Sequence, residues 1–432
     1  MKKVALYTLG CRVNQYETES ITESFTKKGY EVVDFEDYAD VYVINTCTVT
    51  NIGDKKSRKM LRKAKKTNED SVVVAAGCYA QVSPEELSSI EEVDIVVGTS
   101  DKSKIVDFVE EFLQTKEKKN YVNNIMSVRD FEEMDIDEYQ DKTRAFLKIQ
   151  DGCDRYCSYC LIPYARGPVR SRPLENIVEQ VRSLVANGFK EIILSGIHIS
   201  SYGKDLKTHN LVDVVETLSK TIGLERIRIG SIEPMFFSEG VLERLKKVKS
   251  FCPHFHLSLQ SGCDETLKRM NRRYTTKEYK DVVDKIRDTF EDASITTDII
   301  AGFPGETHEE FNETYKFLSD IKLSKMHIFK YSERKGTKAE MLDGKINPQV
   351  KEERSKALIE LDLKNERQYM EKYLGRTMDV LFEEAHDGVY TGYTVNYLKV
   401  IVTSNTKIRG RILKCTLQSI EGDGIIGEII NL

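Results

Sequence analysis

The sequence predicts an α/β protein with three parts: an N-terminal domain with a parallel sheet, a central partial (β/α)6 barrel and a small C-terminal β barrel. Short apolar runs alternate with amphipathic helical segments over most of the chain, which is typical of parallel sheets built from right-handed crossovers. Near the C-terminus the pattern changes to short strands separated by turn residues, which favours a closed barrel. We expect domains at residues 1–115, 144–372 and 373–432, with a linker at residues 116–143.

The composition is that of a globular protein. The chain has 432 residues, of which 40% are hydrophobic and 31% charged, and that length allows about three domains. No apolar run is long enough to cross a bilayer and the first residues begin a strand, so we expect no membrane partner, no signal peptide and a cytoplasmic location. The net charge of −5 does not indicate a nucleic-acid partner, but phosphate binding depends on local patches rather than on the total.

The N-terminal domain carries one cysteine after each of its first three expected strands. Cys11, Cys47 and Cys78, named here the strand-end cysteines, follow these strands in turn. Ligands of a parallel sheet bind beyond the carboxyl ends of its strands, so we expect this edge to gather three thiols into a metal or cluster site. The alternative is that each cysteine is a small buried residue. The strands are expected at residues 4–9, 41–45, 72–76 and 95–97, with helices from about residues 14, 54 and 84.

The helix after Cys47 carries a run of basic residues. Such a run is either the solvated face of a helix or a surface that meets phosphate, and its place beside a metal or cluster site favours neither interpretation over the other. The run comprises Lys55, Lys56, Arg58, Lys59, Arg62, Lys63, Lys65 and Lys66.

A second group of cysteines follows the first strand of the central domain. Cys153, Cys157 and Cys160, named here the loop cysteines, have C-x3-C-x2-C spacing in the stretch DGCDRYCSYC. A structural zinc site normally has four protein ligands, and no fourth Cys or His lies nearby. We therefore favour an iron–sulfur cluster with one open iron, the alternative being a zinc site completed from a distance. Nine cysteines in a reducing compartment also favour metal or cluster binding over disulfides.

Six expected βα units form the central domain, and its active site should lie on the loops that follow the strands. Ser195 and Gly196 follow the second strand, Gln260 follows the fourth, and Asp298 lies on the fifth, where a small cofactor would need polar or glycine residues. Ordinary turns are the alternative for each of them. The strands are expected at residues 145–149, 191–194, 226–229, 255–259, 294–300 and 325–329.

The C-terminal domain follows a long helix at residues 348–374. Tyr390, Tyr393 and Tyr397 are interleaved with Lys399, which suits the stacking of bases and contacts with phosphates. The strands are expected at residues 377–382, 388–394, 398–403, 411–417 and 425–430.

Four motifs resemble the methylthiotransferases of the radical S-adenosylmethionine superfamily. They are TLGCRVNQYETE, VINTCTVTNIGDKKSR, AAGCYAQ and DGCDRYCSYCLIPYARGPVRSRP. The C-terminal barrel resembles the TRAM domain of RNA-modifying enzymes, so the resemblance covers nearly the whole chain. The chain departs from the superfamily at Ser195, Gly196 and Ile197, where a Gly-Gly-Glu element is common, so the resemblance does not assign the contact with the methionine amino group.

The resemblance implies two 4Fe-4S clusters and S-adenosylmethionine as cofactors. The loop cysteines would hold the cluster that generates a radical from S-adenosylmethionine, with Tyr159 as a cofactor contact beside the last of them. The strand-end cysteines would hold an auxiliary cluster that carries the sulfur for transfer. Arg166, Arg170 and Arg172 are candidates for substrate phosphate or methionine carboxylate contacts, with simple ion pairing as the alternative.

The opening motif is most similar to the branch that acts on N6-threonylcarbamoyladenosine beside the anticodon of tRNA. The implied partners are a tRNA anticodon stem-loop and an electron donor protein such as flavodoxin or ferredoxin. Alternative substrates are isopentenyladenosine in tRNA and an aspartate of a ribosomal protein. A non-catalytic RNA-binding protein that holds zinc is the alternative from another class.

Overall fold

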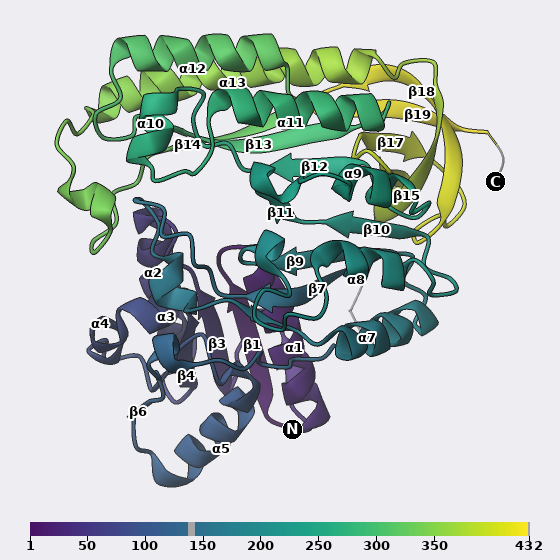
Figure 1. Ribbon diagram of the computed structural model, residues 1–432. Coiled ribbons are helices and arrows are strands. Elements are labelled where there is room, and N and C mark those ends of the chain that lie inside the picture. Colours follow the sequence, from purple (N-terminus) through teal and green to yellow (C-terminus); the bar gives the residue numbers. More distant parts are fainter. Residues whose placement is uncertain (137–142, 431–432) are drawn as a thin grey trace.

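The computed structural model describes residues 1–136 and 143–430, which form an N-terminal unit, a central unit and a C-terminal barrel (Figure 1). The N-terminal unit is a parallel sheet in the order β2-β1-β3-β4-β5-β6. The strands that precede the strand-end cysteines, β1, β3 and β4, are neighbours in it. Its strands are β1 (Lys3–Thr8), β2 (Glu31–Val33), β3 (Val41–Thr46), β4 (Val72–Gly77), β5 (Ile95–Val97) and β6 (Lys119–Asn120).

Helices cover both faces of this sheet, so β3 and β4 are buried along their whole length. Helices α1 and α5 pack on one face, while α2 and α4 pack on the other. The α/β prediction is thereby confirmed for this unit. The helices are α1 (Arg12–Lys27), α2 (Asn51–Thr67), α3 (Cys78–Val82), α4 (Pro84–Ser88) and α5 (Ile105–Thr115).

Part of the expected linker is packed into the fold. Strand β6 pairs with β5 and so extends the N-terminal sheet beyond residue 115. Met134 and Ile136 are buried, and the Tyr16 hydroxyl donates a hydrogen bond to the Met134 carbonyl. The sequence missed β2 and β6 because strands of two or three residues show no alternation to detect. The remainder of the expected linker, residues 137–142, lies outside the described residues.

The central unit is an open barrel whose strands follow the predicted order. Strand β11 continues β10 after Gly230, so the sheets β10-β9-β7-β8 and β11-β12-β13-β14 form one arc. All six predicted strands are present among the described residues. They and the short strands are β7 (Arg144–Asp151), β8 (Arg170–Ser171), β9 (Glu191–Gly196), β10 (Arg226–Ile229), β11 (Ser231–Ile232), β12 (His254–Leu257), β13 (Ser294–Ala301) and β14 (Lys325–Lys330).

The two sides of this arc have different neighbours. Alternate residues of β7, among them Leu147 and Ile149, pack into the core under the outer helices. The intervening residues include Lys148, which faces Glu17 on α1, so the N-terminal unit covers the concave side of the arc. The helices of this unit are α6 (Ile162–Arg166), α7 (Leu174–Ala186), α8 (Leu211–Leu218), α9 (Val241–Lys246), α10 (Asp264–Arg269), α11 (Thr276–Thr289), α12 (His308–Ile321) and α13 (Pro348–Glu371).

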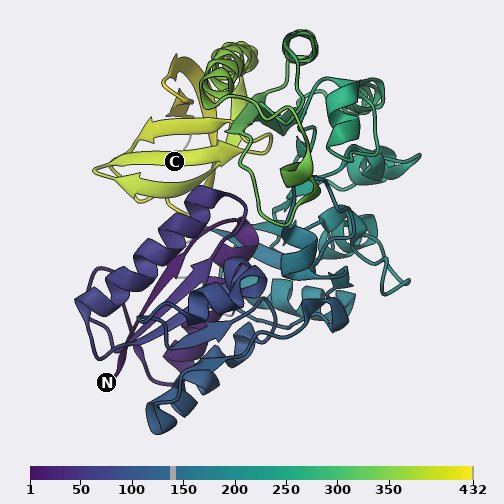
Figure 2. The same ribbon diagram turned by 90° about the vertical axis from the view of Figure 1, so that its left-hand side faces the viewer.

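The C-terminal strands close into a barrel, as predicted, and their order in it is β15-β16-β17-β19-β18. In Figure 2 the barrel, in yellow, lies above the purple N-terminal unit and beside the central unit. Arg226 and Arg228 of β10 donate hydrogen bonds to barrel carbonyls at 2.8–3.0 Å, so the barrel docks at the amino ends of the central strands. Its strands are β15 (Thr377–His386), β16 (Val389–Thr394), β17 (Lys399–Thr403), β18 (Ile412–Glu421) and β19 (Gly424–Ile429). Among the described helices, none is both long and apolar enough to form a transmembrane span.

The contact between α13 and β14 predicts a pH dependence of stability. The Met326 N–H on β14 donates to Asp362 Oδ1 at 2.6 Å, and burial raises the pKa of Asp362 to about 6. A carboxyl whose pKa is raised on folding stabilises the fold at low pH, and that contribution is lost as the pH rises through about 6. Asp362→Asn keeps the acceptor oxygen and removes the charge, so it should raise the free energy of unfolding at pH 8 by about 1–3 kcal/mol.

Urea unfolding of both proteins at pH 4 and pH 8 measures this effect. The gain should be largely absent at pH 4, where the wild-type carboxyl is protonated in the folded state and about half protonated in the unfolded chain. An equal difference at the two pH values would contradict the assignment.

Candidate active site

The strand-end cysteines lie together at the carboxyl edge of the N-terminal sheet. Gly10 has a φ of 107°, and a Cβ at that position would lie only 2.9 Å from Cys47 Sγ, so glycine lets the loop before Cys11 approach Cys47. The pKa of Cys47 is raised to about 12, mainly by burial and in part by the neighbouring Cys78 and Cys11 thiols. Thiols in such a place remain protonated until a metal or cluster takes the proton's place.

The loop cysteines lie beyond the carboxyl end of β7 on a backbone that is held at both ends. Cys153 N–H donates to the Gly167 carbonyl at 3.0 Å, and Ser158 exchanges backbone hydrogen bonds with Met270 and Ala339. Burial raises the pKa values of Cys153 and Cys160 to about 12, with the neighbouring Cys157 adding to both. The three thiols are thus close neighbours on a fixed loop.

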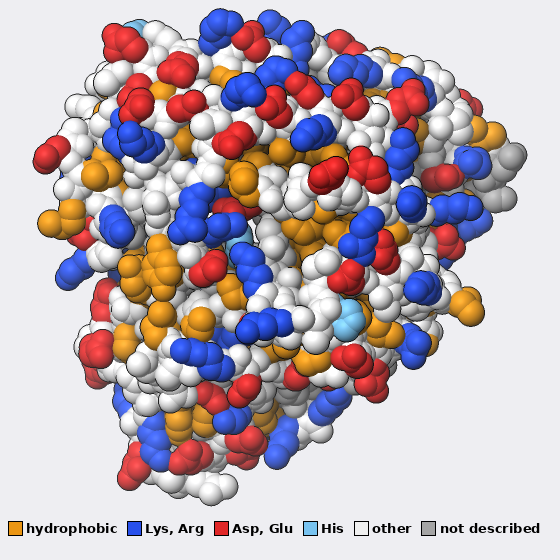
Figure 3. Space-filling model, in the orientation of Figure 1, with side chains coloured by type: hydrophobic (Ala, Val, Ile, Leu, Met, Phe, Trp, Pro, Cys, Tyr) orange, Lys and Arg blue, Asp and Glu red, His pale blue; other side chains and the backbone are white. Residues whose placement is uncertain are grey.

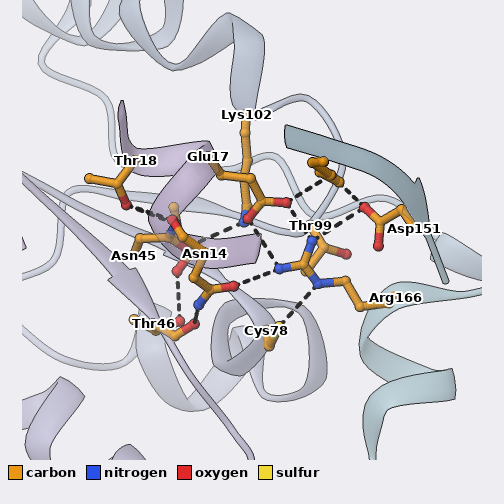
Figure 4. A network of polar contacts seen from close by, with 12 residues as sticks. Asn14, Glu17, Thr18, Asn45, Thr46, Cys78, Thr99, Lys102, Asp151 and Arg166 are labelled. Atoms are coloured by element: carbon orange, nitrogen blue, oxygen red, sulfur yellow. Dashed lines mark hydrogen bonds and ion pairs between the residues drawn. The ribbon is translucent and has the colours of Figure 1, made fainter. Parts of the chain in front are cut away.

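A buried ion network runs from Cys78 to Asp151, which lies two residues before the first loop cysteine (Figure 4). Glu17 of α1 forms ion pairs with Lys102, with Lys148 of β7 and with Arg166 of α6. Lys148 also lies 2.7 Å from Asp151, two residues before Cys153, while the Arg166 Nε–H donates to Cys78 Sγ at 3.2 Å. Opposing cations hold the pKa of Glu17 well below its usual range, although burial alone would raise it. One network therefore reaches from a strand-end cysteine to the start of the loop that carries the others.

The network has more positive than negative charge. Among the described residues, four cations form ion pairs with the two carboxylates, since Arg170 Nη2 also lies 3.6 Å from Asp151 Oδ2. A third carboxyl, Glu132, lies near Lys148, but burial raises its pKa and so disfavours its charged form. A buried excess of positive charge is costly unless an anion lies beside it. Three thiolates, or a cluster that they hold, would supply that anion. The cations are Lys102, Lys148, Arg166 and Arg170, and the carboxylates are Glu17 and Asp151.

Glu233 organises a second polar group beside the loop cysteines. Its carboxylate lies 2.7 Å from Arg155, 3.1 Å from Arg272 and 3.1 Å from His198. Burial would raise the pKa of Glu233, but these neighbours lower it to about 2. Arg272 also donates to Cys157 Sγ at 3.2 Å. Sequence reasoning missed this group, although the placement of Glu233 just after the third predicted strand is a signal that could have found it.

The predicted cofactor contacts lie at the same end of the central strands. Ser195 and Gly196 end β9, where a Cβ on Gly196 would lie 2.8 Å from Gln150 Oε1. Gln260 has a φ of 77° and its N–H donates to the Asp298 carbonyl at 2.9 Å. The Asp298 carboxylate lies 3.3 Å from His256 Nε2.

Tyr159 differs from the other predicted cofactor contacts. Its ring packs edge-on against Phe303 in a small apolar cluster. A contact from Tyr159 to a cofactor would therefore use its backbone.

For three arginines the structure favours the ion-pairing alternative, and for the barrel tyrosines it corrects the prediction of base stacking. Arg166, Arg170 and Arg172 are buried and hold ion pairs or carbonyls, so simple ion pairing, rather than contact with a substrate phosphate, accounts for them. Tyr397 stacks on Tyr393 and on His254, with ring centroids 4.8 and 4.6 Å apart. These rings fasten the barrel to the central unit instead of facing a base, and Tyr390 lies in the barrel core.

The donor set fits iron–sulfur clusters. Each cysteine group offers three thiols with an arginine donating to one sulfur, which compensates the negative charge of a thiolate-bound cluster. Within residues 1–136 and 143–430, no three His, Cys, Asp or Glu side chains are grouped so that they could hold one metal ion.

Two family matches cover most of the N-terminal and central units. Residues 147–318 match the Radical SAM superfamily, and residues 3–98 match the uncharacterized protein family UPF0004. Among solved structures, the radical S-adenosylmethionine methyltransferase TsrM from Kitasatospora setae superposes with a TM-score of 0.55 at 15% identity, over 76% of this chain and 73% of that chain. At this identity the likeness concerns the fold alone.

Curated relatives match over nearly the full length. Threonylcarbamoyladenosine tRNA methylthiotransferase MtaB of Bacillus subtilis is 44% identical over 420 residues, which cover 96% of this chain and 93% of the relative. The protein of that name from Aquifex aeolicus is 47% identical over 88% of this chain and 93% of its own length. The tRNA-2-methylthio-N(6)-dimethylallyladenosine synthase of Acetivibrio thermocellus is 30% identical over 99% of this chain and 91% of its own.

The ion network predicts a large effect of a conservative change. Glu17→Gln leaves Lys102, Lys148 and Arg166 buried without their shared counter-charge, so the free energy of unfolding should fall by about 3–5 kcal/mol. Chemical denaturation followed by circular dichroism measures it. Glu371→Gln is the matched control, because Glu371 pairs with Arg367 on the surface of α13 and its loss should cost at most about 0.5 kcal/mol. Similar losses in the two variants would show that the network does not support the fold.

Proposed function

The chain belongs to the threonylcarbamoyladenosine tRNA methylthiotransferases of the radical S-adenosylmethionine superfamily, and we propose that it attaches a methylthio group to C2 of N6-threonylcarbamoyladenosine beside the anticodon of tRNA. The observation that carries the proposal is the pair of three-thiol groups, one on each unit, joined through one buried ion network. The dimethylallyladenosine alternative has weaker support, since that relative is 30% identical against 44% and 47%.

Two 4Fe-4S clusters and S-adenosylmethionine are the cofactors of this enzyme, and when bound they supply a radical able to attack an unactivated aromatic C–H bond and a sulfur to replace the hydrogen. The loop cysteines would hold the cluster that serves S-adenosylmethionine. The strand-end cysteines would hold the auxiliary cluster. Ser195, Gly196, Gln260 and Asp298 are our candidates for contacts with S-adenosylmethionine, because they line the same end of the central strands.

The chain's own residues prepare these sites electrostatically. Arg166 and Arg272 each direct an N–H at a cysteine sulfur, which places a positive charge beside an atom that a cluster would bind. Lys102 and Lys148 favour the ionised form of Glu17. The ionised Glu17 pairs with Arg166 and so keeps the guanidinium beside Cys78. The fixed backbone of the Cys153 loop limits how far the thiols can move. The protein thus contributes charge compensation and position, while the cofactors contribute the chemistry.

Helix α2 supplies a surface for the RNA backbone. Lys55, Lys59, Arg62 and Lys66 are exposed, and their spacing of four, three and four residues puts them on one side of the helix along about 17 Å. None of the four has a partner among the residues that the structure describes. Of the other four basic residues of the predicted run, Arg58, Lys63 and Lys65 pair with Glu86, Glu36 and Asp94. The fourth, Lys56, lies over the ring of Tyr7 at 5.6 Å from its centroid.

The start of α2 is tied to the junction of the N-terminal and central units. Arg334, which follows β14, donates to Thr48 Oγ1 at 2.6 Å and pairs with Asp54. The Asn51 side chain donates to the Glu333 carbonyl at 2.8 Å. An RNA strand bound along α2 would therefore extend toward Cys47 and the other strand-end cysteines. Figure 3 shows Lys and Arg side chains gathered where the two units meet on that face.

The remaining assignments complete the proposal. We assign residues 1–115 to the auxiliary-cluster domain, 144–372 to the radical domain and 373–432 to a TRAM-like domain, and the pairing of β6 supports extending the first domain to Asn120. A small electron-transfer protein such as flavodoxin or ferredoxin would reduce the clusters. Work on tRNA and the reduced cysteines both suit the cytoplasm.

The two cysteine groups should be separable by mutation. In a strain lacking the gene, the wild-type gene should restore 2-methylthio-N6-threonylcarbamoyladenosine in digested tRNA, as measured by mass spectrometry, and Cys47→Ala should not. The purified wild-type protein should hold about eight irons per chain and Cys47→Ala about four. Cys47→Ala should still cleave S-adenosylmethionine, whereas Cys153→Ala should lose cleavage and product together. Loss of cleavage in Cys47→Ala would mean that the two sites are assigned the wrong way round, and an unchanged nucleoside in the deletion strain would refute the function.

The surface on α2 predicts a change in the salt dependence of tRNA binding. Replacing Lys55, Lys59, Arg62 and Lys66 by glutamine should weaken binding and reduce the slope of log affinity against log salt by about 0.7–0.9 for each phosphate that the variant no longer neutralises. Filter binding over a range of salt concentrations measures the slope. The control replaces four surface cations that pair with acids four residues away on α11, α12 and α13, namely Lys277, Lys280, Lys316 and Arg367. Equal slopes in the two variants would leave only a general effect of net charge.

A further inference from the structure

Arg12 lies beside the strand-end cysteines and is a cation without a counter-charge among the described residues. It follows Cys11 directly, begins α1 and is exposed. Its guanidinium lies over the ring of Phe146, 4.5 Å from the centroid. None of the described carboxylates pairs with it. A cation in the first turn also opposes the dipole of its helix, and that turn holds no acidic residue, so the stability of α1 does not explain Arg12.

The other arginines around the concave side of the central unit each form an ion pair with a carboxylate. Arg144 pairs with Glu383, Arg228 with Glu191, and Arg272 with Glu233. Arg166 is held by Glu17, as described above. Arg12 is therefore the arginine of this neighbourhood, within the described residues, that remains available to an anion from outside the chain.

The position of Arg12 lies between the two units that carry the cysteines. Phe146 belongs to β7, on the same side of that strand as Lys148, which faces the N-terminal unit. The charge of Arg12 also acts on His254 of β12. The pKa of His254 is lowered mainly by burial and then by Arg228, and Arg12 adds a smaller contribution. A group bound at Arg12 would thus stand next to Cys11 and face the concave side of the barrel.

The substrate class in the proposed function presents a matching group. N6-threonylcarbamoyladenosine carries a carboxylate on its side chain, whereas dimethylallyladenosine carries only hydrocarbon at the same nitrogen. A planar guanidinium binds a carboxylate through two parallel hydrogen bonds, and a site with an unpaired cation gains nothing from a hydrocarbon chain. The difference between these two kinds of nucleoside is therefore one that Arg12 can detect.

We propose that Arg12 binds the threonyl carboxylate of the substrate nucleoside and thereby selects it over nucleosides with uncharged side chains. The inference rests on the proposed function and adds the subsite that recognises the substrate. The ring of Phe146 holds the guanidinium in position from one side, and the hydrogen-bonding edge of the guanidinium is left for the ligand. The competing explanation is that Arg12 only packs on Phe146.

Neutralising the carboxylate tests the proposal directly. Anticodon stem-loop RNAs carrying either N6-threonylcarbamoyladenosine or its methyl ester are given to the cluster-loaded enzyme, and single-turnover product formation is measured. The wild type should prefer the acid over the ester by about 10-fold to 100-fold. Arg12→Gln should prefer it by less than about 3-fold, and Arg12→Lys should retain an intermediate preference. The exposed Arg182→Gln on α7 is the matched control and should keep the wild-type ratio.

The ratio of acid to ester is the readout, because a substitution beside Cys11 can also change cluster loading. Iron is counted in every variant, and fluorescence anisotropy of the same two RNAs gives the binding ratio without turnover. A wild-type ratio retained by Arg12→Gln in both measurements would overturn the inference and leave the proposed function intact. A wild-type enzyme that modifies neither RNA would instead overturn the proposed function.

Discussion

The buried ion network around Glu17 is the constraint on which the arrangement of this molecule depends. Its carboxylate, fully enclosed on α1, holds Lys102 of its own unit together with Lys148 and Arg166 of the central unit. The two cysteine groups belong to separate sheets, so the N-terminal and central units must keep a fixed relative position. Apolar packing alone is not directional and would let the two units shift against each other. Directional ion pairs at an interface fix orientation, and breaking one partner leaves the others uncompensated.

The same network links position to charge. At one end of the network, the cation Arg166 contacts Cys78. At the other end, Asp151 closes β7 just before the loop of Cys153, Cys157 and Cys160. Thiols at such buried places would otherwise remain protonated, as the raised pKa values of Cys47, Cys153 and Cys160 indicate. Cluster binding and the closure of the two units are therefore expected to support each other, since the anion that the network lacks is the one that the cysteines provide.

Several arginines and tyrosines around the C-terminal barrel have structural roles. Arg226 and Arg228 bind barrel carbonyls, and Tyr393 and Tyr397 stack between Arg144 and His254, which fastens the C-terminal barrel to the amino ends of the central strands. Among the described residues, the cations of α2 without an acid beside them form the surface that we propose for an RNA. We propose Arg12 in the same way for a single anionic group. In both places the absence of an internal partner, rather than the number of charges, marks the surface that faces a ligand.

Local sequence was enough to locate the main strands and the six cysteines. Strand positions follow from local apolar patterns, and the rule that parallel strands end at one edge brings Cys11, Cys47 and Cys78 together without any knowledge of distance. The edge strands β2 and β6 were not predicted, because they are too short to show an apolar pattern in the sequence. Only the tertiary structure decided which charged groups have a partner. Glu17 and Arg166 are 149 residues apart in the sequence, and Arg144 and Tyr397 are 253 residues apart. Glu233 pairs with His198 and Arg272, which lie on different loops. An ion pair depends on distance in space, which local sequence does not encode, so the free arginine could be told from the paired ones only after the chain had folded.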